Sequence, residues 1–210
     1  MMVKKIKHLD MGFNPALNSD FYQVIADVIY DETCSLEFVS FEGNLMGDRN
    51  VAILSESIMH NARLRVLNLS KNDITDKSST NICKILDHCT SLRGLFLHMN
   101  KFQGKGGLQI ANTLRDNRNL EVFDISFNNI GGGAKTKDQQ RRKELGQKYA
   151  TAWAECFRRN NTMIHVDISH NNLRANQMDI IAEGLRPNNT ILGIHLKGNE
   201  GEVDPQGFIK

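Results

Sequence analysis

Apolar and polar residues follow one another along most of the chain in a nine-residue frame that closes with an asparagine. Residues 64–72 read LRVLNLSKN, with leucine at the first, fourth and sixth places and asparagine at the ninth. Residues 92–100 and 120–128 repeat this frame as LRGLFLHMN and LEVFDISFN. Seven matches run along the chain, and their closing asparagines are Asn14, Asn44, Asn72, Asn100, Asn128, Asn171 and Asn199.

The spacing of these asparagines predicts the architecture. Successive intervals are 30, 28, 28, 28, 43 and 28 residues. A nearly fixed period of this length indicates a solenoid, in which similar units stack and each unit contacts only its neighbours. We therefore predict a single continuous domain over residues 1–210, built of about seven repeats.

Each frame predicts a short strand in its alternating part. Side chains along a strand point to opposite faces in turn, so Leu67 and Leu69 are expected to face the core while Val66, Asn68 and Ser70 face outward. Similar units stacked in register would form a parallel sheet. The closing asparagine needs partners because an unpaired buried amide is costly, and we expect it to bond backbone groups of its own bend and of the adjacent repeat.

Apolar side chains recur at helical spacing between the strands. The helices predicted on this basis cover residues 19–29, 78–88, 107–114 and 176–185. Asparagine-rich turns such as 117–119 follow the helices and lead into the next strand. Each unit thus reads as strand, loop, helix and turn.

The leucine and asparagine frame, its period of 28 and the helix in each unit resemble the leucine-rich repeat superfamily, and within it the ribonuclease-inhibitor-like class. The resemblance extends over about residues 6–199. It implies an α/β leucine-rich repeat solenoid shaped as a horseshoe, with parallel strands on the concave face and helices on the convex face. Solenoids need capping units, but the first repeat begins almost at residue 1 and only 11 residues follow Asn199. We therefore expect the chain to be a segment of a larger protein.

The 43-residue interval between Asn128 and Asn171 marks a basic insertion near 134–148. Insertions in repeats form loops on one face and often carry function. One interpretation is a solvated loop followed by a longer helix over 143–159, with a buried stripe formed by Leu145, Tyr149, Trp153 and Phe157. The other is a docking site for an acidic partner or a phosphate. Its candidate residues are Lys135, Lys137, Arg141, Arg142 and Lys143.

Outward-facing strand positions form the candidate binding surface. In a stacked sheet Phe96 would lie beside Asn68 and Asp124, an apolar anchor ringed by polar groups as at interface hot spots. A lone exposed phenylalanine is also common on ordinary surfaces, so both interpretations stay open. The candidate partner-binding residues on the concave face are Phe38, Asn68, Phe96, His98, Asp124, Asp167 and His195.

Charge and composition remove several functional classes. The chain carries 26 basic and 24 acidic residues, a net charge of +2. The predicted concave face also has few aromatic residues, and both observations argue against nucleic acid as a partner. No apolar run reaches membrane-spanning or signal-peptide length, so no membrane association is expected. The cysteines do not show zinc-site spacing, and their scatter is typical of buried thiols in a reducing compartment.

Residue types suited to acid–base or nucleophilic chemistry do occur together on the predicted wall, as Asp124, Asp167 and His195 near Ser126 and Ser169. An open sheet has no enclosure to exclude water, which such chemistry needs. The segment GGGAKT at 131–136 departs from phosphate-binding loops, because Ala stands where that motif requires glycine before lysine. We therefore predict no catalytic residues, no metal site and no cofactor.

The sequence favours a non-enzymatic intracellular scaffold that binds another protein on its concave face, as a cytoplasmic monomer. Two alternatives stay open. The repeat class resembles that of the Ran GTPase-activating proteins, which implies a regulator of a small GTPase. It also resembles tropomodulin-like repeats, which implies a cytoskeletal or ciliary module. The sequence alone does not identify the partner.

Overall fold

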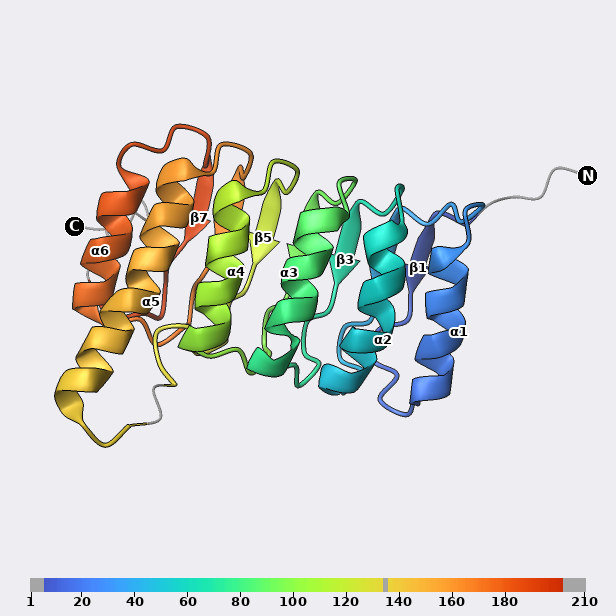
Figure 1. The fold of residues 1–210 in the computed structure, drawn as a ribbon, viewed down its shortest axis with the longest axis horizontal. Helices are drawn as coiled ribbons and strands as arrows, with labels where there is room; N and C mark the ends of the chain where they lie inside the picture. The colour runs from blue at the N-terminus through green and yellow to red at the C-terminus, as the bar shows by residue number, and fades with distance from the viewer. Residues whose placement is uncertain (1–5, 134–135, 202–210) are drawn as a thin grey trace, which may run out of the picture.

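The computed structural model describes residues 6–133 and 136–201, and in these residues seven short strands alternate with six α-helices (Figure 1). The strands are β1 (His8–Asp10), β2 (Phe38–Ser40), β3 (Val66–Asn68), β4 (Gly94–Phe96), β5 (Val122–Asp124), β6 (His165–Asp167) and β7 (Gly193–His195). The helices are α1 (Ser19–Tyr30), α2 (Gly47–His60), α3 (Ser79–His88), α4 (Gly104–Asp116), α5 (Gln139–Arg159) and α6 (Ala175–Leu185). A short 3₁₀ turn, η1 (Asp76–Ser78), precedes α3.

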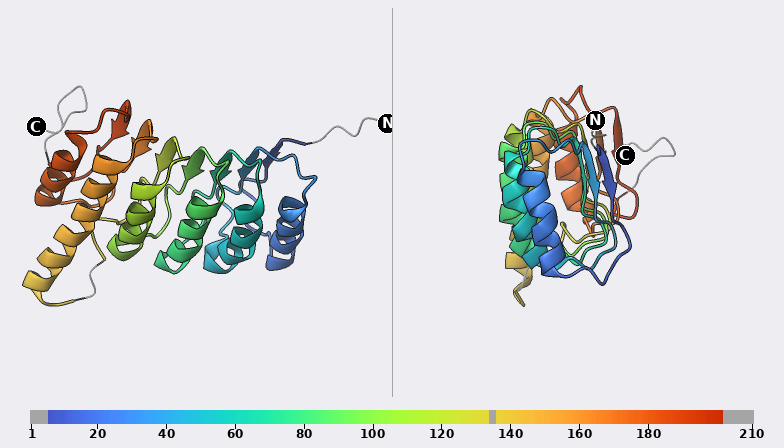
Figure 2. Two further views of the ribbon diagram at one scale, coloured as in Figure 1. Left: turned by 45° about the horizontal axis from the view of Figure 1, so that its top comes forward. Right: turned by 90° about the vertical axis from the view of Figure 1, so that its right-hand side faces the viewer.

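All strands pair in parallel and in chain order, β1 to β7, as the repeat predicts. The register is the expected one, for example with Asn68 opposite Phe96 and Phe96 opposite Asp124. The helices form one layer and the strands the other, and the row of strands is bowed so that it lies on the inner side of a shallow arc (Figures 1 and 2). This open α/β solenoid is the fold predicted from the sequence.

The predicted helices are confirmed with changes at their ends. Helix α4 begins at Gly104, three residues before the predicted start, and α5 begins at Gln139 instead of 143. Helix α2 is missing from the predicted set although Val51, Leu54 and Ile58 are buried at helical spacing. That stripe was a usable signal.

The core lies between the two layers and is supplied by the apolar places of the frame. Leu67, Leu69, Leu95 and Leu97 are all essentially inaccessible to solvent. Burying each such side chain contributes about 1.5–3 kcal/mol relative to leaving it exposed. Layers at the ends of the stack have a neighbour on one side only, and there the frame residue Ile6 is 68% exposed.

The closing asparagines join neighbouring repeats, as Asn72 illustrates. Its Nδ2 donates to the carbonyl oxygens of Phe41 at 2.7 Å and Ser70 at 2.9 Å. Its Oδ1 accepts from the backbone N–H groups of Asn44 at 3.0 Å and Met46 at 3.2 Å. Because Asn72 is fully buried, these bonds supply the partners that a buried amide requires.

The residue before each closing asparagine adopts a left-handed backbone conformation. Its φ lies between 51° and 77° at Phe13, Gly43, Lys71, Met99, Phe127, His170 and Gly198. Only glycine adopts this region freely, and other residues pay a steric cost of about 1–2 kcal/mol. The turn ends each strand and directs the chain around the edge of the sheet toward the next helix.

A second set of asparagines pins the opposite edge, where helices lead back into strands. Asn117 donates from Nδ2 to the carbonyl oxygen of Leu86 at 2.7 Å and accepts from the backbone N–H groups of Asn119 and Leu120. Asn61, Asn160 and Asn188 make equivalent bonds. The sequence had shown these residues only as turn formers, and the structure shows that they also bridge repeats.

Candidate functional site

The solvent-exposed concave face of the sheet, which we call the wall, carries side chains that accept hydrogen bonds from nearby backbone N–H groups. Oδ1 of Asn68 accepts from the N–H of Ser70 at 3.0 Å, and Oδ1 of Asp124 accepts from the N–H of Ser126 at 2.9 Å. Asp10 and Asp167 make the same bond two residues onward. Such local bonds explain why Asp and Asn recur at the last position of these strands.

The serines two residues beyond these positions do not face solvent, which corrects the sequence-based expectation. Ser70, Ser126 and Ser169 are 0%, 4% and 6% exposed. The strands end before them, and the chain has already turned inward at the bend. In other repeats the residue two positions beyond the strand is longer and reaches solvent, as the half-buried Glu42 and His98 do.

A charged network crosses four consecutive repeats on this face. Lys71 Nζ lies 2.6 Å from Glu42 Oε1, and Asn68 Nδ2 donates to Glu42 Oε2 at 3.1 Å. His98 lies between two carboxylates, with Nε2 3.9 Å from Glu42 Oε1 and Nδ1 3.4 Å from Asp124 Oδ2. The hydrogen bond from Lys71 is the main cause that holds the pKa of Glu42 below its usual value.

Asp124 is a half-buried carboxylate that stays ionised. Burial acts to raise its pKa, but the nearby His98 and the hydrogen bond from the backbone N–H of Ser126 outweigh burial and hold the pKa below its ordinary value. At neutral pH this part of the wall therefore carries a fixed negative charge.

Phe96 lies half-buried between Asn68 and Asp124 in the register. Its ring lies over Gly94, where an added Cβ would come within 3.4 Å of the ring and within 3.5 Å of Val66. These are ordinary van der Waals distances, so the ring packs closely over the backbone at 94. Together Asn68, Phe96, His98 and Asp124 form a contiguous group, which we call the central cluster.

The other predicted wall residues lie toward the two ends of the sheet. Phe38 stacks on His8 with ring centroids 3.9 Å apart and planes inclined by 6°. His195, beside Asp167 in the register, has its Nε2 3.1 Å from Nε2 of His165. These residues extend the wall on either side of the central cluster.

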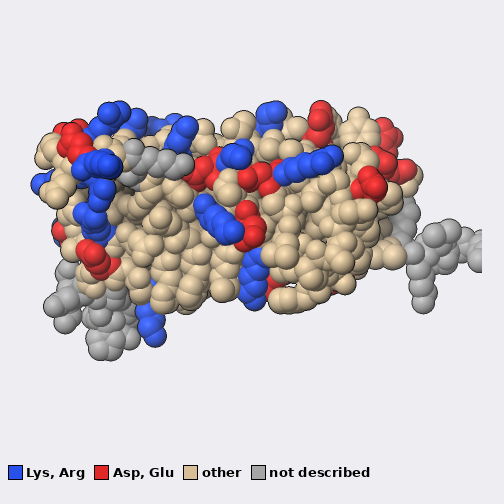
Figure 3. Space-filling model, turned by 90° about the horizontal axis from the view of Figure 1, so that it is seen from below, with Lys and Arg blue, Asp and Glu red and all other residues tan. Residues whose placement is uncertain are grey.

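The insertion has the form of an exposed segment followed by a long helix, as one of its two sequence-based interpretations describes, and the docking-site interpretation stays a prediction. Lys135 lies outside the described residues; Lys137 precedes the helix, and Arg141, Arg142 and Lys143 lie in the first turns of α5. These turns are exposed and project beyond the neighbouring helices (Figure 1), with basic side chains gathered over them (Figure 3). Further along the helix Leu145 is half-buried, while Tyr149, Trp153 and Phe157 are buried.

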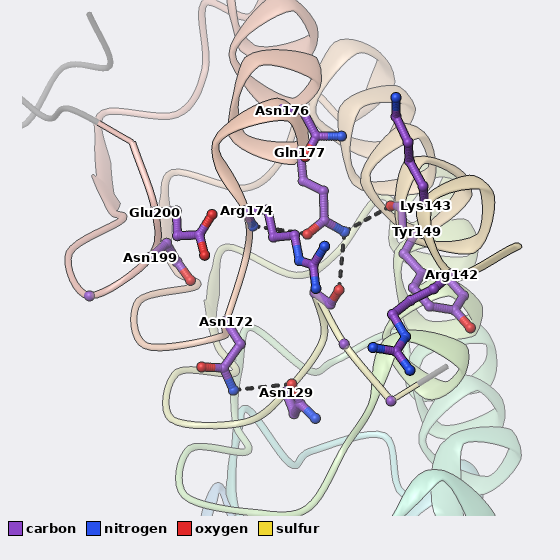
Figure 4. Close-up of a pocket in the computed structure, with 15 residues that line it drawn as sticks. Asn129, Arg142, Lys143, Tyr149, Asn172, Arg174, Asn176, Gln177, Asn199 and Glu200 are labelled. Carbon is purple, nitrogen blue, oxygen red and sulfur yellow. Dashed lines mark hydrogen bonds between the residues drawn. The ribbon is translucent and has the colours of Figure 1, made fainter. Parts of the chain in front are cut away.

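A hollow of about 540 Å³ lies between the insertion and the start of α6 (Figure 4). Arg142 and Lys143 in its lining are candidate docking residues from the sequence, whereas Arg174 and Gln177, which belong to the following repeat, are not among those candidates. Gln177 is buried and donates from Nε2 to the carbonyl oxygens of Gly131 at 3.1 Å and Gly146 at 2.8 Å. It therefore ties the two ends of the insertion to α6.

The three glycines at the start of the insertion are explained by packing. A Cβ on Gly131 would lie 2.5 Å from the carbonyl oxygen of Asn172, and one on Gly132 would lie 2.4 Å from Oδ1 of Asn129. Gly133 has a φ of +83°, a conformation that favours glycine. A nucleotide is not needed to account for this run.

The remaining reactive groups are structural in character. Burial raises the pKa of the Cys83, Cys89 and Cys156 thiols, which disfavours the nucleophilic thiolate. Within residues 6–133 and 136–201, no three His, Cys, Asp or Glu side chains gather as a metal site would require. No helix in the described part of the chain is long and apolar enough to cross a bilayer.

Comparison with known sequences finds repeat proteins. A family model described as "Leucine Rich repeat" matches residues 60–82 and 116–133. The human "NACHT, LRR and PYD domains-containing protein 13" is 26% identical over 129 residues, covering 61% of this chain and 12% of that protein. The human "Capping protein, Arp2/3 and myosin-I linker protein 3" is 26% identical over 162 residues, covering 75% and 11%. The chain thus spans about one-eighth of the length of these relatives.

Solved structures with the same fold include domains of leiomodin and tropomodulin. The leiomodin-1 actin-binding site 2 superposes with a TM-score of 0.58 and 17% identity, covering 82% of this chain and 90% of that one. The C-terminal domain of tropomodulin from Caenorhabditis elegans gives a TM-score of 0.55 and 12% identity, covering 87% and 83%. At these identities the likeness concerns the fold.

Proposed function

The chain belongs to the leucine-rich repeat proteins, and from that premise we propose that it is a non-enzymatic module that binds another protein through the outer face of its sheet. The observation that carries the proposal is the central cluster. Asn68 and Asp124 are already fixed by bonds to their own backbone, and they flank the half-buried ring of Phe96. A surface ordered before binding loses little conformational entropy when a partner arrives.

The charges of the wall indicate the chemistry of the partner. Lys71 neutralises Glu42, whereas among the described residues the ion-pairing partner of Asp124 is His98, which is cationic only when protonated. A basic side chain of the partner would complement Asp124, and an apolar side chain would cover Phe96. We therefore propose a partner segment in which a lysine or arginine lies next to an apolar residue.

We further propose that the partner belongs to the cytoskeleton and that the protein acts in the cytoplasm. This is supported by the likeness to a protein named as a linker of capping protein, Arp2/3 and myosin-I over 75% of the chain. The shared fold of leiomodin and tropomodulin domains agrees with it. Regulation of a small GTPase stays a hypothesis, since none of the similar proteins reported above is named as a GTPase regulator.

Co-sedimentation with actin filaments tests both the proposed binding surface and the proposed cytoskeletal partner. We expect saturable binding, weakened at least about tenfold by Phe96→Ala and by Asp124→Asn. The melting temperature should be unchanged for Phe96→Ala and slightly lower for Asp124→Asn, because the ionised carboxylate of Asp124 contributes to stability. Asp124→Asn removes the charge but keeps an acceptor for the N–H of Ser126. Val24→Ala and Asp116→Ala serve as controls, because both residues are exposed on the helical layer.

Two results would count against it. Full binding by both wall variants would remove the sheet face as the site. Failure to co-sediment would remove filamentous actin as the partner, and GTP-hydrolysis assays with a panel of small GTPases would then test the alternative.

A further inference from the structure

The hollow beside the insertion is built by three successive repeats. Its walls come from the loop after β5, the first turns of α5, the start of α6 and the loop after β7 (Figure 4). A second hollow, lined in part by Arg142, Lys143 and Arg174, adjoins it. The same basic residues therefore border both hollows.

Two guanidinium groups from different repeats point toward each other in this space. Figure 4 shows Arg142 reaching in from α5 and Arg174 from the start of α6, whereas Lys143 points away. Within residues 6–133 and 136–201, none of the ion pairs involves Arg142 or Arg174. The Arg142 side chain donates to the carbonyl oxygen of Thr136 at 2.8 Å. Like charges facing one another are unfavourable unless an anion lies between them.

The charge of the lining is positive overall. Arg142, Lys143 and Arg174 stand against the single carboxylate of Glu200, which accepts from the N–H of Ala175 at 3.4 Å at the first turn of α6. Figure 4 shows Glu200 on the opposite side of the hollow from Arg142. The region between the two guanidinium groups is therefore free of negative charge from the described lining.

We propose that this hollow binds a phosphate group, with Arg142 and Arg174 as its two principal ligands. Each guanidinium offers a planar fork of N–H donors that matches adjacent phosphate oxygens. A phosphate group has three terminal oxygens and up to two negative charges, so it accepts from both forks, whereas a carboxylate offers two oxygens and one charge.

The framework around the two arginines is rigid. The buried side chain of Gln177 bonds Gly131 and Gly146, and its Oε1 accepts from the N–H of Arg174 at 2.9 Å. The ring of Tyr149 lies against Gly104, where an added Cβ would come within 2.1 Å of it. These contacts fix where both arginines leave the backbone.

The phosphate could be free in solution or carried by a peptide, and titration calorimetry at constant ionic strength separates the two sources. One arm uses inorganic pyrophosphate, and the other uses a phosphoserine peptide together with its unphosphorylated form. We expect saturable binding in at least one arm. Arg142→Ala and Arg174→Ala should each weaken it by about tenfold or more, the loss expected for a charge-assisted bond.

Two further variants make the result independent of folding defects. Arg141→Ala removes an equal charge one residue away, outside the lining of the hollow, and should change affinity less than twofold. Glu200→Gln removes the opposing charge and should tighten binding severalfold, a gain that a misfolded protein would not show. Absence of saturable binding in both arms would overturn the proposal. So would equal losses for Arg141→Ala and Arg142→Ala. The result is independent of the partner proposed for the sheet face.

Discussion

Helices α4 and α5 share the buried positions that pack against the sheet, but α5 is longer at its start. Trp153 and Phe157 in α5 occupy the places that Ile110 and Leu114 occupy in α4, and all four are fully buried. The 21 residues of α5 exceed the 13 of α4 because α5 has extra turns before Tyr149. Those turns have no counterpart in a regular repeat and are mainly exposed.

The framework continues past the insertion without a break. Strands β5 and β6 pair in register, Asn171 donates from Nδ2 to the carbonyl oxygen of Ile125 at 2.9 Å, and the N–H of Ile130 donates to Oδ1 of Asn171 at 3.3 Å. The extra residues are looped out at one edge. Packing thus constrains the second half of α5, while the first half is free to serve binding.

The largest effect that tests this contrast is expected from Trp153→Ala. Trp153 is fully buried, with Phe123 at 6.1 Å and Phe157 at 5.8 Å between ring centroids. Removing a core aromatic residue costs about 3–5 kcal/mol. Urea denaturation should show this loss, while Arg141→Ala in the projecting half should stay within about 0.5 kcal/mol. Similar losses for both variants would mean that the whole helix is structural.

The next effect concerns the asparagines that join repeats. Asn72→Ala leaves the carbonyl oxygen of Phe41 and the N–H of Asn44 without their partner inside the protein, and a loss of about 3 kcal/mol is expected for these buried groups. Asn14→Ala is the matched control, because Asn14 is exposed and water replaces its bonds. Equal destabilisation by the two substitutions would show that burial does not set the cost.

A smaller effect is expected from deleting residues 134–148. The deletion restores the 28-residue period and aligns Trp153 with its regular place, but Gln177 loses the carbonyl of Gly146 as a partner. We expect stability to change by about 1 kcal/mol, since one lost bond is partly offset by a shorter loop. Circular dichroism and urea denaturation measure the change. A variant that does not refold would show that the insertion belongs to the core.

The sequence predicted the framework well because one physical cause, stacking, acts on every repeat. Leu67, Asn72 and their equivalents recur, so period and register follow from a count of residues. Helix α2 lies outside the predicted set although the helical spacing of Val51, Leu54 and Ile58 indicates it. Ser70 was misplaced because alternation was extended beyond the end of the strand, where the left-handed turn at Lys71 begins.

The hollow is harder to predict from the sequence. Arg142 stands out within a basic run, but Arg174 has no basic neighbour in the sequence beyond His170 and lies about 30 residues further along. Only the stacking of α6 on α5 brings the two together. The central cluster differs, because its members lie in neighbouring strands and the register alone brings Asn68, Phe96 and Asp124 side by side.

The smallest expected effect is a pH dependence of the stability that the ionised carboxylate of Asp124 contributes to the repeat framework. The pKa of Asp124 is below its ordinary value in the folded protein, while the unfolded chain has a pKa of about 3.9. The bonds of the ionised carboxylate therefore stabilise the fold above about pH 3.9, and this contribution is lost as pH falls through the lower folded pKa. Urea denaturation between pH 6 and pH 3 should show that the difference in unfolding free energy between the protein and Asp124→Asn becomes smaller toward acid.

A second variant, His98→Ala, should raise the pKa of Asp124, which carboxyl carbon NMR can follow. A difference in unfolding free energy that stays constant with pH would mean that the charge of Asp124 does not stabilise the wall.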